Sequence, residues 1–133
     1  MGGPDAIAGI AAALIADAAL AALIGDDQVF ESVPERAREP YLVVGPARTR
    51  DWSTATERGD EVEVEVRLHG RAMRMCDADA VMERVRAAVV FDGVALPRGA
   101  LVNLEPLTQS TRRRPADDRL EIVQRFRVVI EQD

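Results

Sequence analysis

The sequence contains no lysine, one cysteine and one histidine, and only 4% of its residues are aromatic. A single cysteine cannot form an intramolecular disulfide, so the disulfide-stapled folds of small secreted domains are excluded and folding in a reducing cytoplasm is favoured. One histidine and one cysteine cannot complete a zinc or iron site, which needs more nitrogen or sulfur ligands. Because aromatic residues are scarce, alanine, valine, leucine and isoleucine must fill the interior.

No basic residue precedes Arg36, so the apolar segment 6–25 lacks the basic region with which a signal peptide begins. If this segment spanned a membrane, Asp17 would lie near the middle of the bilayer, at a cost of at least ~2.5 kcal/mol. We therefore expect no interaction with a membrane.

The chain is acidic, with a net charge of −6 and an isoelectric point near 4.9. Affinity for DNA rests mainly on lysine and arginine side chains that neutralise phosphates, so sequence-specific DNA binding is disfavoured. The charge is compatible with a wall along which DNA passes without being held.

A length of 133 residues, 47% of them hydrophobic, indicates one domain over residues 1–133. The alanine-rich segment 5–24 predicts one helix, started by Pro4 and stopped by Gly25. Its apolar arc includes Leu14, Leu20 and also Asp17, and no wide charged face remains. Burial against both the sheet and a neighbouring subunit is one interpretation, and simple tolerance of exposed alanine is the other.

Period-two alternation is clearest over residues 61–68, where valine and leucine alternate with glutamate and arginine, so one face is buried and the other is wet and acidic. Other strands are expected at 28–33, 41–44, 99–107 and 119–131. Helical periodicity returns over residues 77–91, with Asp77 as the expected N-cap.

These elements predict an α+β fold in a single domain. We expect an antiparallel sheet of about four strands, with two helices packed on one face and long hairpin loops over residues 46–59 and 108–118. Long ordered loops often carry function.

No catalytic constellation is visible. His69 and Cys76 are the only pair that could form a nucleophile–base dyad, and neither a third orienting residue nor an oxyanion loop can be named for them. We expect no catalytic residue, no metal site, no cofactor and no enzymatic activity.

The loop over residues 46–59 has the composition of a partner-binding arm. Trp52, the only tryptophan, lies among Arg48, Arg50, Asp51 and Arg58, and a tryptophan in such surroundings is typical of an interface anchor. The alternative is that Trp52 folds back over its own core.

The second loop carries the one cationic cluster, formed by Arg112, Arg113 and Arg114. In a protein of net charge −6, we favour an acidic protein surface over a phosphate as the target of this cluster.

The order and spacing of several short segments resemble the small tail-terminator, or tail-completion, proteins of long-tailed phages and gene transfer agents. The resemblance spans nearly the whole chain and departs from the family pattern at Gly70 and Arg71, where members often have tryptophan and serine. The matching segments are Leu23–Asp26, Pro40–Gly45, Asp51–Thr54, Arg58–Glu61, Leu68–His69 and Arg125–Val128.

This resemblance implies a structural virion protein of the head–tail neck, assembled in the bacterial host cytoplasm. Such a protein forms a homo-hexameric ring that caps the tail-tube protein, stops tube polymerisation and contacts the head-side stopper or connector protein, while DNA passes through without sequence-specific binding. Other interpretations are a head-side stopper (head completion) protein, a tail-tube subunit and, remotely, a small enzyme or ligand-binding domain.

Overall fold

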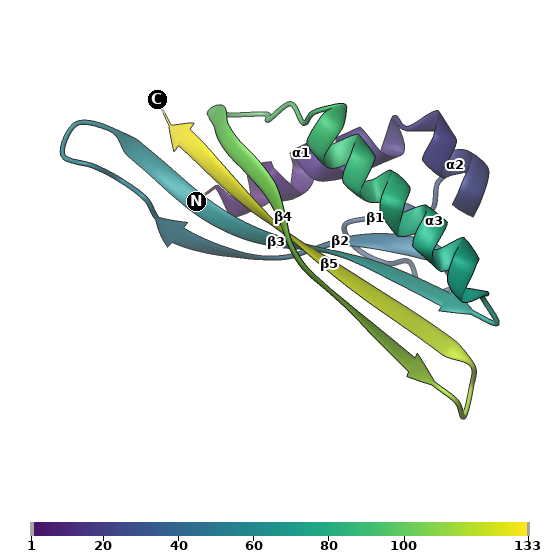
Figure 1. Cartoon of the computed structure of the whole chain (residues 1–133). Helices are drawn as coiled ribbons and strands as arrows, with labels where there is room; N and C mark the ends of the chain where they lie inside the picture. The colour runs from purple at the N-terminus through teal and green to yellow at the C-terminus, as the bar shows by residue number, and fades with distance from the viewer. Residues whose placement is uncertain (1, 133) are drawn as a thin grey trace.

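The computed structural model describes residues 2–132 as one five-stranded sheet with a helical layer on one face (Figure 1). The strand order is β1-β2-β3-β5-β4; β1 runs parallel to β2, and the other neighbouring pairs are antiparallel. The elements are α1 (Gly3–Ile15), α2 (Ala18–Ile24), β1 (Val29–Phe30), β2 (Tyr41–Asp51), β3 (Arg58–Arg71), α3 (Met75–Arg86), the π-helical turn η1 (Ala87–Phe91), β4 (Ala100–Arg114) and β5 (Arg119–Gln132).

The predicted α+β class is confirmed, with corrections to its parts. A fifth strand, β1, makes the sheet mixed rather than purely antiparallel, and it covers only Val29–Phe30 of the expected 28–33. The side chain of Gln28, which is 5% exposed, holds the following connection by donating from Nε2 to the carbonyl oxygens of Arg38 (2.5 Å) and Pro40 (2.8 Å).

The prediction of one helix over residues 5–24 is wrong, because the chain turns between α1 and α2. Asp17 has an extended backbone and caps α2, accepting hydrogen bonds at Oδ1 from the backbone N–H groups of Ala19 (3.0 Å) and Leu20 (3.3 Å). Asp17 Oδ2 lies 2.7 Å from Arg84 Nε on α3, so the same carboxylate also ties the helices together.

The expected N-cap of the second long helix is also wrong. Arg74 occupies the N-cap of α3, and Asp77 lies in the first turn, where its carboxylate faces the positive end of the helix dipole. At its other end, α3 continues into η1, in which the N–H of Asp92 donates to the carbonyl oxygen of Ala87 (3.0 Å).

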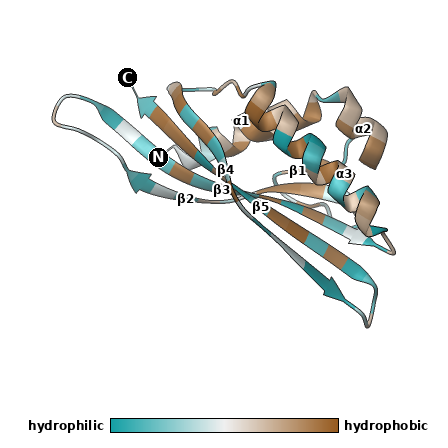
Figure 2. Cartoon of the chain, viewed as in Figure 1, coloured by the Kyte–Doolittle hydropathy of each residue, from teal (hydrophilic) through white to brown (hydrophobic). Residues whose placement is uncertain are grey.

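Both long hairpin loops are mostly strand. β2 extends through Asp51 and β4 through Arg114, which leaves only residues 52–57 and 115–118 as connections. In Figure 1 the two hairpins project beyond the helical layer in opposite directions. The projecting ends are hydrophilic in Figure 2, whereas apolar residues concentrate where the helices meet the sheet.

The core lies between the helices and one sheet face. Alternate residues of β3 and β5 point into it, and residues of α1, α2 and α3 close it from above. Fully buried members include Ile10, Leu20, Val64, Val81 and Phe126, each 0% exposed.

Within residues 2–132, no single helix is long and apolar enough to cross a membrane. Only α1 and α2 together meet a length and composition test, and they are bent by 78° at their junction.

Asp17→Ala is expected to lower the free energy of unfolding by about 2–4 kcal/mol, because it removes both a helix cap and a charged hydrogen bond. Asp17→Asn retains a capping oxygen and should lose only about 1–2 kcal/mol, the part due to Arg84. Urea titrations of the two variants measure the difference. Equal losses in both variants would show that the ion pair, not the cap, dominates.

Candidate partner-binding surfaces

The structure separates the two residues considered as a catalytic dyad. Cys76 is exposed in the first turn of α3, with Sγ 4.0 Å from Asp77 Oδ1. His69 lies on the opposite, helix-free face of the sheet, stacked on Tyr41 with ring centroids 5.2 Å apart. No cluster of three or more histidine, cysteine, aspartate or glutamate side chains suited to a metal occurs in the described part of the chain.

The helix-free face is not the acidic surface that β3 alone suggests. The strand register places the glutamates of β3 beside arginines of the neighbouring strands. Arginines outnumber glutamates on this face: Arg48, Arg50, Arg67, Arg71, Arg112, Arg114, Arg119, Arg125 and Arg127 accompany Glu61, Glu63, Glu65, Glu105, Glu121 and Glu131.

Ion pairs cross three strands of this face. Arg127 on β5 lies 3.1 Å from Glu61 on β3 and 3.3 Å from Glu105 on β4. The hydrogen bond from Arg127 lowers the pKa of Glu61. One row away, Arg125 Nε lies 3.4 Å from Glu65 Oε2. Arg125 and Arg127 are therefore ion-paired with glutamates of the same face.

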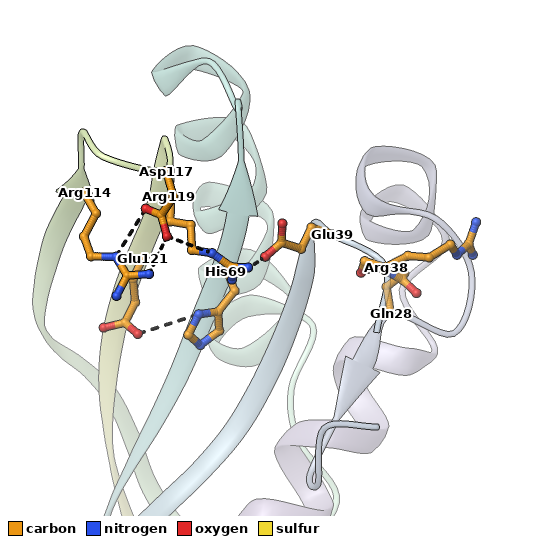
Figure 3. A network of polar contacts seen from close by, with 8 residues as sticks. All are labelled: Gln28, Arg38, Glu39, His69, Arg114, Asp117, Arg119 and Glu121. Atoms are coloured by element: carbon orange, nitrogen blue, oxygen red, sulfur yellow. Dashed lines mark hydrogen bonds and ion pairs between the residues drawn. The ribbon is translucent and has the colours of Figure 1, made fainter. Parts of the chain in front are cut away.

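Figure 3 shows a second polar network at the end of the sheet where β4 and β5 meet. Arg119 lies 2.9 Å from Glu39 and 3.3 Å from Asp117, and Arg114 lies 2.5 Å from the same Asp117 oxygen. Hydrogen bonding to Arg114 lowers the pKa of Asp117.

A surface cavity of about 190 Å³ opens beside this network. His69 lines it, with Nδ1 3.7 Å from Glu121 Oε2. Arg112 also lines it, so the cavity combines arginine, imidazole and carboxylate groups.

His69 is expected to make the protein less stable in mild acid. Burial lowers the pKa of His69, an effect that Glu121 partly opposes. The unfolded chain takes up this proton near pH 6.5 and the folded chain only at lower pH. The stability present above pH 6.5 is therefore lost as the pH falls through the folded pKa.

Denaturant midpoints at pH 7.5 and 5.5 test this effect. The wild type should lose more stability between the two values than His69→Gln, which cannot be protonated. Identical losses in the two proteins would contradict the assignment.

The tip of the β2–β3 hairpin is a hydrogen-bonded turn. Asp51 Oδ1 accepts from the N–H of Ser53 (2.9 Å). Hydrogen bonding to the Ser53 side chain, and secondly to this backbone N–H, lowers the pKa of Asp51. The N–H of Trp52 donates to the carbonyl oxygen of Gly59 (2.8 Å), and the N–H of Thr54 donates to the carbonyl oxygen of Glu57 (2.9 Å).

Trp52 lies outside the core and is 41% exposed. Its ring packs on Gly59, where an added Cβ would lie only 2.9 Å from Cε3. One side of the indole therefore contacts the hairpin backbone and the other is available to a partner. The interpretation of Trp52 as a core residue is not supported.

The other arginines of the predicted arm lie along the hairpin strands. Arg48 and Arg50 are on β2 opposite Glu63 and Glu61, and Arg50 Nη2 lies 3.8 Å from Glu61 Oε1. Arg58 is exposed at the start of β3.

The predicted cationic cluster is divided between the two sides of β4. Arg113 points toward the helical layer, where it donates to the carbonyl oxygen of Met73 (2.9 Å) and pairs with Asp118 at 2.7 Å. Arg112 and Arg114 are level with Glu121 and Arg119 on the helix-free face.

Leu14 and Leu20, predicted at a subunit interface, are 1% and 0% exposed in the chain's own core. Asp17, from the same prediction, caps α2 and forms an ion pair with Arg84. Among the described residues, the helical layer exposes four large apolar side chains that the helical periodicity did not single out: Ile15 (65%), Leu23 (47%), Met75 (39%) and Phe91 (84%).

Comparison with known proteins identifies this architecture. Residues 8–131 match the family described as "Tail completion protein gp17". A chain of the solved structure "Virion of native gene transfer agent (GTA) particle" has 31% sequence identity and a TM-score of 0.86, with 96% of each chain covered. No curated protein matches the sequence. The resemblance seen in the sequence is confirmed, and the chain belongs to the tail completion protein gp17 family, whose members are structural components of the virion and not enzymes.

Proposed function

We propose that this protein is a tail terminator. Six copies form a ring on the last ring of tail-tube protein, stop its polymerisation and join the tail to the head-side stopper or connector protein. The observation that carries the proposal is a tail completion fold from which two hairpins project past the helical layer in opposite directions (Figure 1). Two hairpins that project in opposite directions allow one subunit to contact different neighbouring proteins through separate surfaces.

The β2–β3 tip supports a contact with another protein. It presents a half-exposed tryptophan on a rigid, hydrogen-bonded turn, and a rigid aromatic anchor loses little conformational entropy on binding. We assign this tip to the tail tube.

The helix-free face supports passage of DNA through the ring. Arg125 and Arg127 are held by glutamates of neighbouring strands, so their guanidinium groups are less available to phosphates. Where arginines are paired with glutamates in this way, the face offers fewer free cations to phosphates and gives less of the counterion release that drives tight DNA binding.

Negative-stain imaging of the purified protein tests the ring. A terminator is expected to give single six-membered rings. Long cylinders would indicate a tail-tube subunit, the first alternative, and rings that bind the head connector but not tail tubes would indicate a head-side stopper.

A further inference from the structure

The two outer edges of the sheet are complementary, and we propose that the cationic end of β4 in one copy docks on the acidic β1 edge of the next copy. This contact rests on the proposed ring, because it names the two surfaces that would join neighbouring subunits. The acidic edge consists of β1 and its flanking residues 26–35. The cationic end consists of residues 109–114.

The register places both edges at the same height. Val29 of β1 is level with Leu42, and this row continues through Leu68 and Ile122 to Thr111 of β4. A ring of identical subunits needs two different surfaces on opposite sides of each subunit. It closes only when each contact rotates the next subunit without shifting it along the ring axis; otherwise a helical filament forms. Opposite edges in one row meet this requirement.

The acidic edge carries four carboxylates that pair with no residue described in the structure. Asp26, Asp27, Glu31 and Glu35 are exposed, and the segment 26–35 has no basic residue. None of the four forms an ion pair with another residue in the range 2–132. A basic surface of a second copy would neutralise them.

Arg112 is the available cation on the other edge. Asp118 and Asp117 already engage Arg113 and Arg114, whereas Arg112 has neither an ion pair nor a side-chain hydrogen bond to any described residue. It is exposed beside the 190 Å³ cavity, which leaves room for a carboxylate. A guanidinium binds a carboxylate through two parallel hydrogen bonds.

The backbone directions also fit. β4 and β1 are the outermost strands, and the sheet topology makes β4 antiparallel to β1. A second copy that continues the sheet would therefore pair these edges in antiparallel fashion. Pairing is confined to residues 109–114, because Pro106 lacks an N–H and an irregularity follows it. With Thr111 level with Val29 of the neighbour, Arg112 is level with Gln28, and Asp27 and Asp26 of the neighbour lie one and two positions further along the edge.

Charge reversal tests the contact by sedimentation over a range of protein concentrations. Arg112→Glu alone and Asp26→Arg alone should each raise the concentration needed for ring formation at least tenfold. The two changes together should restore assembly to within about threefold of the wild type. Arg98→Glu, which makes the same charge change at a side chain that is 87% exposed, is the control and should assemble normally.

Two outcomes overturn the contact while leaving the ring in place: wild-type rings that tolerate Arg112→Glu, or a double variant as defective as the single ones. A wild-type protein that remains monomeric at every concentration overturns the ring itself, and with it this contact.

Discussion

Trp52→Ala should leave the protein folded but weaken its binding to the tail tube about 30-fold or more. Truncation of a central aromatic anchor often costs at least ~2 kcal/mol of binding energy, and each 1.4 kcal/mol corresponds to a tenfold change. Little stability should be lost, because Trp52 is 41% exposed and lies outside the core.

Trp52→Phe is the matched control, since it retains an aromatic anchor and should recover most of the affinity. Replacement of residues 52–59 by Asn-Gly, a favoured two-residue hairpin turn, removes the tip together with Trp52 and preserves the strand pair up to Asp51 and Asp60. This variant should also fold and fail to cap tubes. If both Trp52→Ala and the shortened hairpin still terminated tails of normal length, the tube contact would have to lie elsewhere, with the β4–β5 hairpin as the next candidate.

Leu20→Ala should lower the free energy of unfolding by about 2–5 kcal/mol, because it opens a cavity in a packed core. Leu20 is 0% exposed on α2, where it belongs to the same core cluster as Leu14. Such a loss is a large share of the stability of a domain this size.

Leu23→Ala, on the same short helix, is the control: it makes the same change in helix propensity and in the conformational entropy of the unfolded chain. Leu23 is 47% exposed, so its replacement should change stability by only about 0.5 kcal/mol in the dissociated protein. Thermal melts at low protein concentration compare the two. Similar small losses would contradict the burial of Leu20.

The sequence signal for a strand was clearest where one sheet face is buried. Over residues 61–68 the helices cover alternate side chains, and the alternation of valine and glutamate follows from that. Where β2 and β4 project past the helices, both faces are solvated, so nothing demands alternation and Arg48–Asp51 and Arg112–Arg114 resemble loops. The projecting hairpins, which carry the candidate site, were therefore the least predictable part of the fold.

The break between α1 and α2 left a signal that could have been used. Alanine favours a continuous helix on both sides, and no glycine or proline lies between Ile10 and Ile24, the part of the segment that contains the break. Asp17 alone marks the break, since aspartate is among the preferred N-cap residues. Its partner Arg84 is 67 positions away, and a contact at that separation is set by tertiary packing.

The candidate surfaces were predicted in composition but not in arrangement. Trp52 and the arginine cluster were singled out by composition, but whether Trp52 lies outside the core was left open and became clear only from its 41% exposure. The face of the sheet on which each arginine lies decides whether it is paired. Side chains alternate along β4, so Arg113 points toward Met73 and Arg112 lies on the helix-free face. The acidic edge at 26–35 became significant only when the five-strand register placed it level with Arg112.

The length distribution of tail tubes tests the central claim most directly. Tail-tube protein from the same particle is allowed to polymerise with and without this protein, and the products are imaged by electron microscopy. The account predicts that tubes stop growing once the protein is added and that each carries one extra ring at one end. Tubes that keep growing, or that incorporate this protein along their length, would contradict it.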